Sequence, residues 1–242
     1  MSQTPPQKPQ SWMPGMVPTL NHRGFMSETL DRFGMSFVSY AAICGEEVLD
    51  MGCAYGVATR EVLERGGRVL ACDMESGHVE ILAREMPPEF RPRLRTAVGK
   101  LPEADFPERS FGAILCSRVL HFLTGDEIRE AVAKMARWLR PGGRLFLIAD
   151  TPYTGFWFSI APDYERRKAA GEEWPAFISN VAPLLQKDEL PDGMLAYLNP
   201  LDPDLLAREC ERAGLLIEEA AFTGRGGDPE GRQHAGVIAL RR

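Results

Sequence analysis

The chain has few of the features that mark metal-binding, disulfide-bonded or membrane-spanning proteins. Its 242 residues include five cysteines, with no C-x-x-C pair among them, and four histidines in unrelated segments. We therefore predict neither a disulfide framework nor a metal cluster. No apolar run approaches the roughly 20 residues of a membrane helix, and the basic start and apolar core of a secretion signal are missing at the N-terminus. We expect a cytoplasmic protein with reduced cysteines and no membrane insertion.

Positive charge is also scarce. Lysine and arginine together number 28 against 34 acidic residues, which gives a net charge of −6. Because phosphate backbones are bound by basic surfaces, we expect no nucleic-acid partner. The hydrophobic content of 44% and the charged content of 26% are those of an ordinary globular domain. The sequence lacks the G-x-S-x-G elbow of hydrolases and the G-x-x-x-x-G-K-[ST] phosphate loop.

The most informative segment runs from Glu47 to Arg65. It begins as an apolar, β-prone stretch, turns at Gly52 and Gly56, and continues as a helix. Such a turn brings backbone N–H groups and a helix N-terminus to a ligand. Both glycines are expected because a Cβ would block that approach. The pattern D-x-G-x-x-x-G-x-x-T has one glycine fewer than the dinucleotide fingerprint G-x-G-x-x-G.

This pattern resembles the first motif of the class I S-adenosylmethionine-dependent methyltransferases, in particular their small-molecule, type 11-like branch. The acid-ended strand Arg68–Asp73 and the segments LRPGGRLF and ERAGLLIEEA are similar to further family motifs. The resemblance implies S-adenosyl-L-methionine as cofactor and a doubly wound α/β fold. Its seven-stranded, mostly parallel sheet would have the order 3-2-1-4-5-7-6 with the last strand antiparallel. The alternation of strands and helices independently favours a mostly parallel sheet. A doubly wound domain with another ligand, or with none, is the alternative.

The resemblance also assigns roles around the cofactor. Asp50 would face its ammonium group, Asp73 would accept both ribose hydroxyls, and Met74 would lie against the adenine. Lys100 stands where many family members have an acid for the adenine amino group; backbone groups of Lys100 and Leu101 would then serve, or Lys100 points to solvent. The predicted cofactor-binding residues are Asp50, Gly52, Cys53, Ala54, Gly56, Asp73, Met74, Lys100, Leu101 and Ser117.

Two residues are candidates for catalysis. His121 follows the fourth strand, at the edge where open α/β sheets bind ligands, and could serve as a general base. The alternative is that it packs beside the cofactor. Tyr153, at the start of an aromatic-rich segment, is the second candidate. A strong base is not always required, because the leaving group is already activated and the protein contributes mainly orientation and exclusion of water.

We divide the chain into a lead-in, residues 1–26, and a methyltransferase domain, residues 27–242, with residues 151–199 as a helical substrate lid after strand 5. The proline-rich lead-in also carries large apolar residues, so it either closes over a ligand as a flap or packs on the domain. The spacing of apolar residues predicts a helix over Ser27–Ile43 with Ser27 as its N-cap. The last strand, Gln233–Leu240, is expected at an edge of the sheet.

The resemblance implies methyl transfer to an oxygen, nitrogen or carbon nucleophile of a small, aromatic or apolar molecule. The aromatic residues of the lid suit such an acceptor, although they would also serve as the lid's own core. Two alternatives remain open: methylation of a quinone, a lipid or a macromolecule, and cofactor binding by a regulatory protein without catalysis. The sequence leaves the oligomeric state open, a homodimer included.

Overall fold

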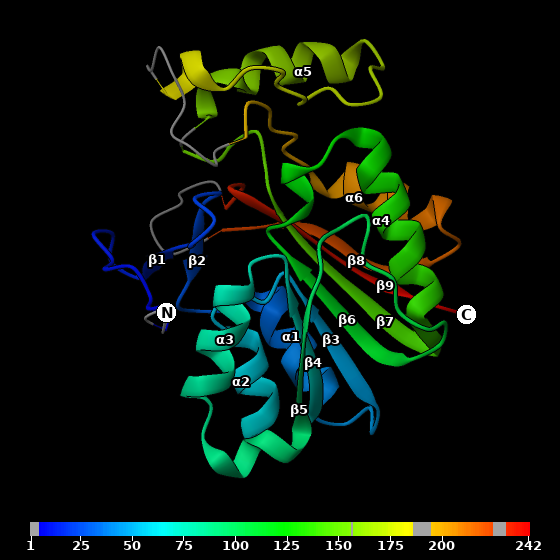
Figure 1. Cartoon of the computed structure of the whole chain (residues 1–242). Coiled ribbons are helices and arrows are strands. Elements are labelled where there is room, and N and C mark those ends of the chain that lie inside the picture. The colour runs from blue at the N-terminus through cyan, green and yellow to red at the C-terminus, as the bar shows by residue number, and fades with distance from the viewer. Residues whose placement is uncertain (1–4, 156, 186–194, 225–230) are drawn as a thin grey trace.

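The computed structural model describes residues 5–155, 157–185, 195–224 and 231–242, and a seven-stranded sheet forms its centre (Figure 1). The strands are β3 (Glu47–Met51), β4 (Arg68–Asp73), β5 (Leu94–Val98), β6 (Phe111–Ser117), β7 (Leu139–Asp150), β8 (Leu216–Thr223) and β9 (His234–Leu240). Their spatial order is β5-β4-β3-β6-β7-β9-β8. Neighbours from β5 to β7 are parallel, and β9 is antiparallel to both β7 and β8. Counted from β3, this order is 3-2-1-4-5-7-6, so the predicted fold is confirmed.

The predicted edge position of the last strand is wrong. β9 lies between β7 and β8, and β8 forms the outer edge. The physical reason lies in the side chains: most of β9 is buried, whereas β8 alternates between exposed and half-buried positions and carries Glu218 and Glu219. A strand with charged, exposed side chains is suited to an edge, where its free backbone groups meet water.

Helices cover both faces of the sheet. They are α1 (Arg32–Ala41), α2 (Val57–Glu64), α3 (Ser76–Glu85), α4 (Gly125–Trp138), α5 (Ala161–Ala169) and α6 (Pro203–Arg212). Short 3₁₀ turns are η1 (Pro88–Arg93), η2 (Leu120–Phe122), η3 (Phe158–Ile160) and η4 (Ala182–Leu185). No helix in the described ranges is long and apolar enough to cross a membrane.

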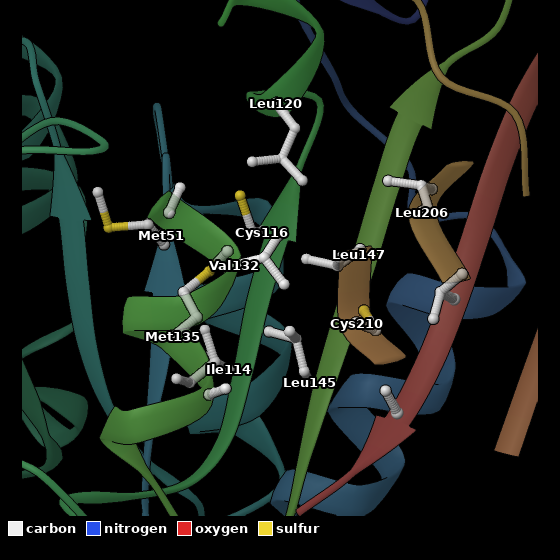
Figure 2. Close-up of a cluster of buried hydrophobic side chains, with 14 of the residues drawn as sticks. Met51, Ile114, Cys116, Leu120, Val132, Met135, Leu145, Leu147, Leu206 and Cys210 are labelled. Atoms are coloured by element: carbon white, nitrogen blue, oxygen red, sulfur yellow. The ribbon is translucent and has the colours of Figure 1, made fainter. Parts of the chain in front are cut away.

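Two hydrophobic cores lie on opposite faces of the sheet, because successive strand side chains point to opposite sides. In β6, Ile114 and Cys116 join one core, and Ala113 and Leu115 join the other. The first core packs against α4 and α6, as Figure 2 shows for Val132, Met135, Leu206 and Cys210. The second core packs against α1, α2 and α3. The sheet is therefore covered on both faces. The part of it that is left for a ligand is the end of the sheet at which the parallel strands terminate.

The N-terminal segment forms two short antiparallel strands, β1 (Met16–Pro18) and β2 (Phe25–Ser27), which we call the N-terminal hairpin (residues 16–27). The predicted helix start at Ser27 is wrong, because Ser27 ends β2 and its hydroxyl hydrogen-bonds the backbone of Thr29. The helix begins at Arg32 instead. Its N-cap is Asp31, whose carboxylate accepts the backbone N–H of Gly34 at 2.9 Å.

The insert after β7 is fastened to the body at two places. Tyr164 and Lys168 of α5 both hydrogen-bond Asp202, which also caps α6 by accepting the N–H of Leu205 at 2.8 Å. On the other side, Glu173 pairs with Arg129 of α4 at 2.7 Å and with Arg212 of α6 at 3.0 Å. The insert therefore sits over the ends of α4 and α6, at the top of the molecule in Figure 1.

We predict that Gly236→Ala destabilises the fold. A Cβ at this position of β9 would overlap the ring of Phe33, which is fully buried in α1. We expect the free energy of unfolding to fall by about 1–3 kcal/mol, the range for overpacked cores, as measured by urea denaturation. Gly155→Ala is the control, because a Cβ there meets no atom within 4 Å. Equal stability of the two variants would contradict the close packing of β9 on α1.

Candidate functional site

Four side chains that could bind a ligand or take part in catalysis lie at one edge of the sheet, where the parallel strands end. Asp50 is near the end of β3, and Asp73, Ser117 and Asp150 end β4, β6 and β7. Because these strands are parallel and adjacent, their carboxyl ends meet at the same edge. In open α/β sheets this is where ligands bind. The insert after β7 lies above the same edge (Figure 1).

The glycine turn after β3 is held against its neighbours. Gly52 and Cys53 donate their backbone N–H groups to the carbonyl of Cys72 at 2.8 and 3.0 Å. Gly52 and Gly56 both adopt the left-handed backbone region, with φ of +82° and +80°. A Cβ would overlap Val119 at Gly52 and Leu82 at Gly56. The glycines were predicted, and contact with these protein side chains already leaves no room for a Cβ at either position.

Asp50 is a buried carboxyl group beside this turn. One of its oxygens accepts the hydroxyl hydrogen of Thr59 at 2.7 Å. Burial, aided by the negative charge of Asp73, raises the pKa of Asp50 to about 6, although the hydrogen bonds from Thr59 act in the opposite direction. A carboxyl group in this situation is stabilised as an anion by any cation placed next to it.

Asp73 is buried and held by three N–H groups. Its Oδ2 accepts the backbone N–H of Ala54 at 2.8 Å, and its Oδ1 accepts that of Glu75 at 2.9 Å. His78 Nδ1 lies 3.0 Å from the same Oδ1. Sequence reasoning missed His78. The available signal was its position in the first turn of the helix that follows Asp73, which points its side chain back toward the end of β4.

The structure brings some predicted cofactor residues together and sets one apart. Cys53, Ala54 and Leu101 are buried near the turn, while Met74 and Ser117 are half-buried. Burial raises the pKa of the Cys53 thiol, which keeps it protonated. The side chain of Lys100 is exposed and pairs with Glu103 at 2.8 Å. Lys100 therefore points to solvent, which was one of the two options that the sequence left open.

His121 is buried at the far side of the same edge. Its Nδ1 accepts the backbone N–H of Asp150 at 3.3 Å, so its proton sits on Nε2. Burial lowers the pKa of His121 below its ordinary value, which favours the neutral ring. Since one ring nitrogen already accepts a hydrogen bond and the other carries the proton, this geometry favours a supporting role over that of a general base.

Tyr153 lies near the start of the insert after β7. Its ring contacts Tyr164 and Phe222 edge-on, Arg232 stacks on it at 3.5 Å, and its hydroxyl donates to Glu165. Burial and this hydrogen bond raise the pKa of Tyr153, so the hydroxyl stays protonated. These contacts place Tyr153 in the small core of this insert rather than against the ends of β3 and β6.

A polar cluster that sequence reasoning missed surrounds Asp150. His234 Nδ1 lies 3.1 Å from Asp150 Oδ1, and Arg118 Nε lies 3.9 Å from it. Arg118 also donates to His234 Nε2 at 3.1 Å. Burial raises the pKa of Asp150, but His121, His234 and Arg118 outweigh this effect and hold that pKa below its ordinary value. Only the register of β7 and β9, which pairs Asp150 with His234, brings these residues together.

Asn199 lies next to this cluster, where the insert rejoins the body. Its backbone N–H donates to the carbonyl of His121 at 2.8 Å, and its side chain is fully buried. Neither polar atom of its amide has a hydrogen-bond partner in the described parts of the chain. Buried polar groups are nearly always paired with protein or ordered water, so this amide is an exception among the buried polar groups of this region.

The chain is similar to known methyltransferases in sequence and in structure. Residues 48–143 match the family model described as Methyltransferase domain. The chain is 26% identical to a ubiquinone biosynthesis O-methyltransferase of Hahella chejuensis, over 72% of this chain and 68% of that protein. It is 38% identical to a demethylmenaquinone methyltransferase of Tropheryma whipplei, over 42% of this chain but only 40% of that protein. The structure of a SAM-dependent methyltransferase of Methanosarcina mazei has a TM-score of 0.65 at 16% identity, covering 88% and 99% of the two chains.

We predict that Thr59→Val makes stability more dependent on pH. The hydroxyl of Thr59 favours the ionised form of Asp50, so its loss should raise the pKa of Asp50 further. The folded-state pKa of about 6 already exceeds the unfolded value of about 3.9. The stability contribution of Asp50 is therefore full below about pH 4 and is lost as the pH rises through about 6. At pH 8 the variant should lose about 1–2 kcal/mol, and less at pH 4.

Urea denaturation between pH 4 and 8 measures this difference. Ser36→Ala is the control, because the hydroxyl of Ser36 is exposed and donates only to the carbonyl of Arg32. A loss in Thr59→Val that stays constant over this pH range would mean that Thr59 does not act through Asp50.

Proposed function

Since the chain belongs to the class I S-adenosylmethionine-dependent methyltransferases, we propose that it methylates an oxygen, nitrogen or carbon nucleophile of a small aromatic or apolar molecule. The observation that carries this proposal is the glycine turn between β3 and α2 with a buried carboxyl group at either side. Asp50 lies beside the turn, and Asp73 accepts an N–H from within it.

These residues fit the cofactor in charge and in hydrogen-bonding capacity. The ammonium group of S-adenosyl-L-methionine would neutralise Asp50, whose ionised form lacks a compensating cation and whose pKa burial raises to about 6. The N-terminus of α2 offers N–H groups and a positive dipole end to the carboxylate of the cofactor. Asp73, already oriented by three N–H donors, has one lone pair left, on Oδ2, for a ribose hydroxyl.

When bound, the cofactor supplies a methyl group activated by attachment to a positively charged sulfur. The protein then has to hold the acceptor in line and exclude water. The lid insert, fastened to α4 and α6, is placed for the second task. The anchored ends of this insert keep its aromatic core over the edge where β6 and β7 end.

The chemistry at the ends of β6 and β7 restricts the acceptor. Asp150 is already compensated by Arg118 and His234, and His121 already accepts a backbone hydrogen bond. Among the described residues at the ends of β6 and β7, none combines a free lone pair with a raised pKa that would suit a general base. We therefore propose an acceptor whose hydroxyl group is far more acidic than an aliphatic alcohol, such as a phenol, a catechol or an enol, with a pKa of about 10 as in tyrosine.

A quinol is the specific candidate within this class. The curated relatives carry the names ubiquinone biosynthesis O-methyltransferase and demethylmenaquinone methyltransferase. A quinol combines acidic hydroxyl groups with an apolar ring, which agrees with the aromatic lid and with the unpaired amide of Asn199. The amide can donate to one ring oxygen and accept from another.

We predict that Asp73→Ala weakens binding of S-adenosyl-L-methionine. Wild type should bind in the micromolar range by calorimetry, and loss of the ribose acceptor should cost about 1–3 kcal/mol. Glu64→Ala is the matched control, because Glu64 is an exposed acid at the far end of α2. Absence of binding by folded wild-type protein would overturn the proposed function, and equal affinity of Asp73→Ala would overturn the role of Asp73.

We also predict that acceptor ionisation controls the rate. With S-adenosyl-L-methionine present, catechol, 3,4-dihydroxybenzoate and a short-chain quinol should yield methylated product, with rates that rise as the pH approaches the pKa of each phenol. Cyclohexane-1,2-diol, which has the shape of catechol but no acidic hydroxyl, should yield none. Mass spectrometry of the products measures both. Methylation of amines alone, or of the diol as fast as catechol, would refute the proposed acceptor class.

A further inference from the structure

The N-terminal hairpin rests on the part of the site that holds Asp73. Val17, Leu20 and Met26 pack with Tyr55 of the glycine turn and Ile81 of α3. The hydroxyl of Tyr55 donates to the carbonyl of Pro18 at 2.8 Å. Figure 1 shows β1 and β2 beside the N-terminal end of α3. The hairpin is therefore in direct contact with the turn and with the helix that follows Asp73.

A chain of hydrogen bonds connects the hairpin to Asp73. The backbone N–H of Leu20 donates to His78 Nε2 at 2.9 Å, and His78 Nδ1 lies 3.0 Å from Asp73 Oδ1. Because Nε2 accepts, the proton of the neutral ring must be on Nδ1, facing the carboxylate. The ring of Tyr55 packs edge-on against His78 at 4.8 Å and fixes its orientation. All of these side chains are buried.

We propose that His78 is the positioning residue of the Asp73 carboxylate and that, through it, docking of the N-terminal hairpin and binding of S-adenosyl-L-methionine stabilise each other. The proposal rests on the proposed role of Asp73 as ribose acceptor. His78 has the connections for this task, because one ring nitrogen contacts the cofactor-binding acid and the other contacts only the hairpin.

The physical reason is orientation. A carboxylate that is free to rotate loses that freedom when it binds a hydroxyl group, and a group fixed beforehand avoids this loss. His78 fixes Asp73 only while its proton faces Oδ1, and the N–H of Leu20 selects that tautomer. Linkage is reciprocal: if the docked hairpin strengthens cofactor binding by some factor, the bound cofactor strengthens docking by the same factor.

Two substitutions separate the two hydrogen bonds. In His78→Asn the side-chain amide takes the place of Nδ1, so contact with Asp73 is kept and contact with Leu20 is lost. In His78→Gln the amide reaches the place of Nε2, so contact with Leu20 is kept and contact with Asp73 is lost. Tyr55→Phe removes the bond to Pro18 and serves as a second route to a released hairpin. Arg84→Gln is the control, since Arg84 of α3 bonds only Pro6 and Glu80, outside the hairpin.

Two measurements on the full chain test the proposal. Calorimetry with S-adenosylhomocysteine gives the dissociation constant, and trypsin cleavage after Arg23, in the loop between β1 and β2, reports release of the hairpin. We expect both His78 variants and Tyr55→Phe to bind about 5-fold or more weakly than wild type. Cleavage without ligand should be faster in His78→Asn and Tyr55→Phe than in His78→Gln. Saturating ligand should slow cleavage of wild type by the factor by which His78→Asn weakens binding.

Other outcomes separate the two proposals. If wild type does not bind S-adenosylhomocysteine, the proposed function itself fails. If wild type binds, Asp73→Ala does not, and the His78 and Tyr55 variants bind like wild type, only the role of His78 is overturned. Lower melting temperatures with unchanged dissociation constants would likewise reduce His78 to a structural residue. Should the His78 variants fail to fold, Tyr55→Phe decides by the same two measurements.

Discussion

The turn between β3 and α2 has no room for a side chain at either glycine, and the site is arranged around that restriction. Val119, from the loop after β6, fills the space at Gly52, and Leu82 of α3 fills the space at Gly56. Ala54, between the glycines, bonds Asp73 at the end of β4. One turn thus fixes the relative positions of three strand–helix units. The backbone N–H groups of this turn, which would contact a ligand, are held as rigidly as the core beneath them.

Two carboxyl groups at the same edge, the buried Asp50 and the half-buried Asp150, have opposite surroundings. Asp50 has a neutral hydroxyl as its partner, and burial raises its pKa, whereas Asp150 has two histidines and an arginine nearby, which lower its pKa. Among the described residues, no cation offsets the negative charge of ionised Asp50 at the end of β3, whereas Arg118 lies close to Asp150 at the end of β7. The end of β3 therefore attracts positive charge, and the end of β7 does not. Opposed environments of this kind separate the roles of chemically identical groups. In the proposed function this separation gives the cationic cofactor one end of the edge and the neutral acceptor the other.

Most of the fold could be read from the sequence because its signals are local. The turn after β3 and the acid at the end of β4 each follow from a few neighbouring residues, whereas the order of strands was implied by the resemblance to a known family. Ser27 failed as a helix start because a serine that bonds the backbone two residues on looks like an N-cap in sequence. The partners of Asp150 could not be found, since β7 and β9 meet 84 residues apart and nothing near Asp150 encodes His234. His78 was closer, but its role depends on Leu20, which lies 58 residues away.

The position of β9 has a consequence for how the chain is made. In chain order β9 comes last, yet in space it fills the gap between β7 and β8. While the protein emerges from the ribosome, β7 must wait with an unpaired edge, and β8 has no neighbour to join. An open, apolar edge of this kind is a template for pairing with other chains. The interval between synthesis of β7 and of β9, about 90 residues, is therefore the period in which a nascent chain most needs the protection of a chaperone.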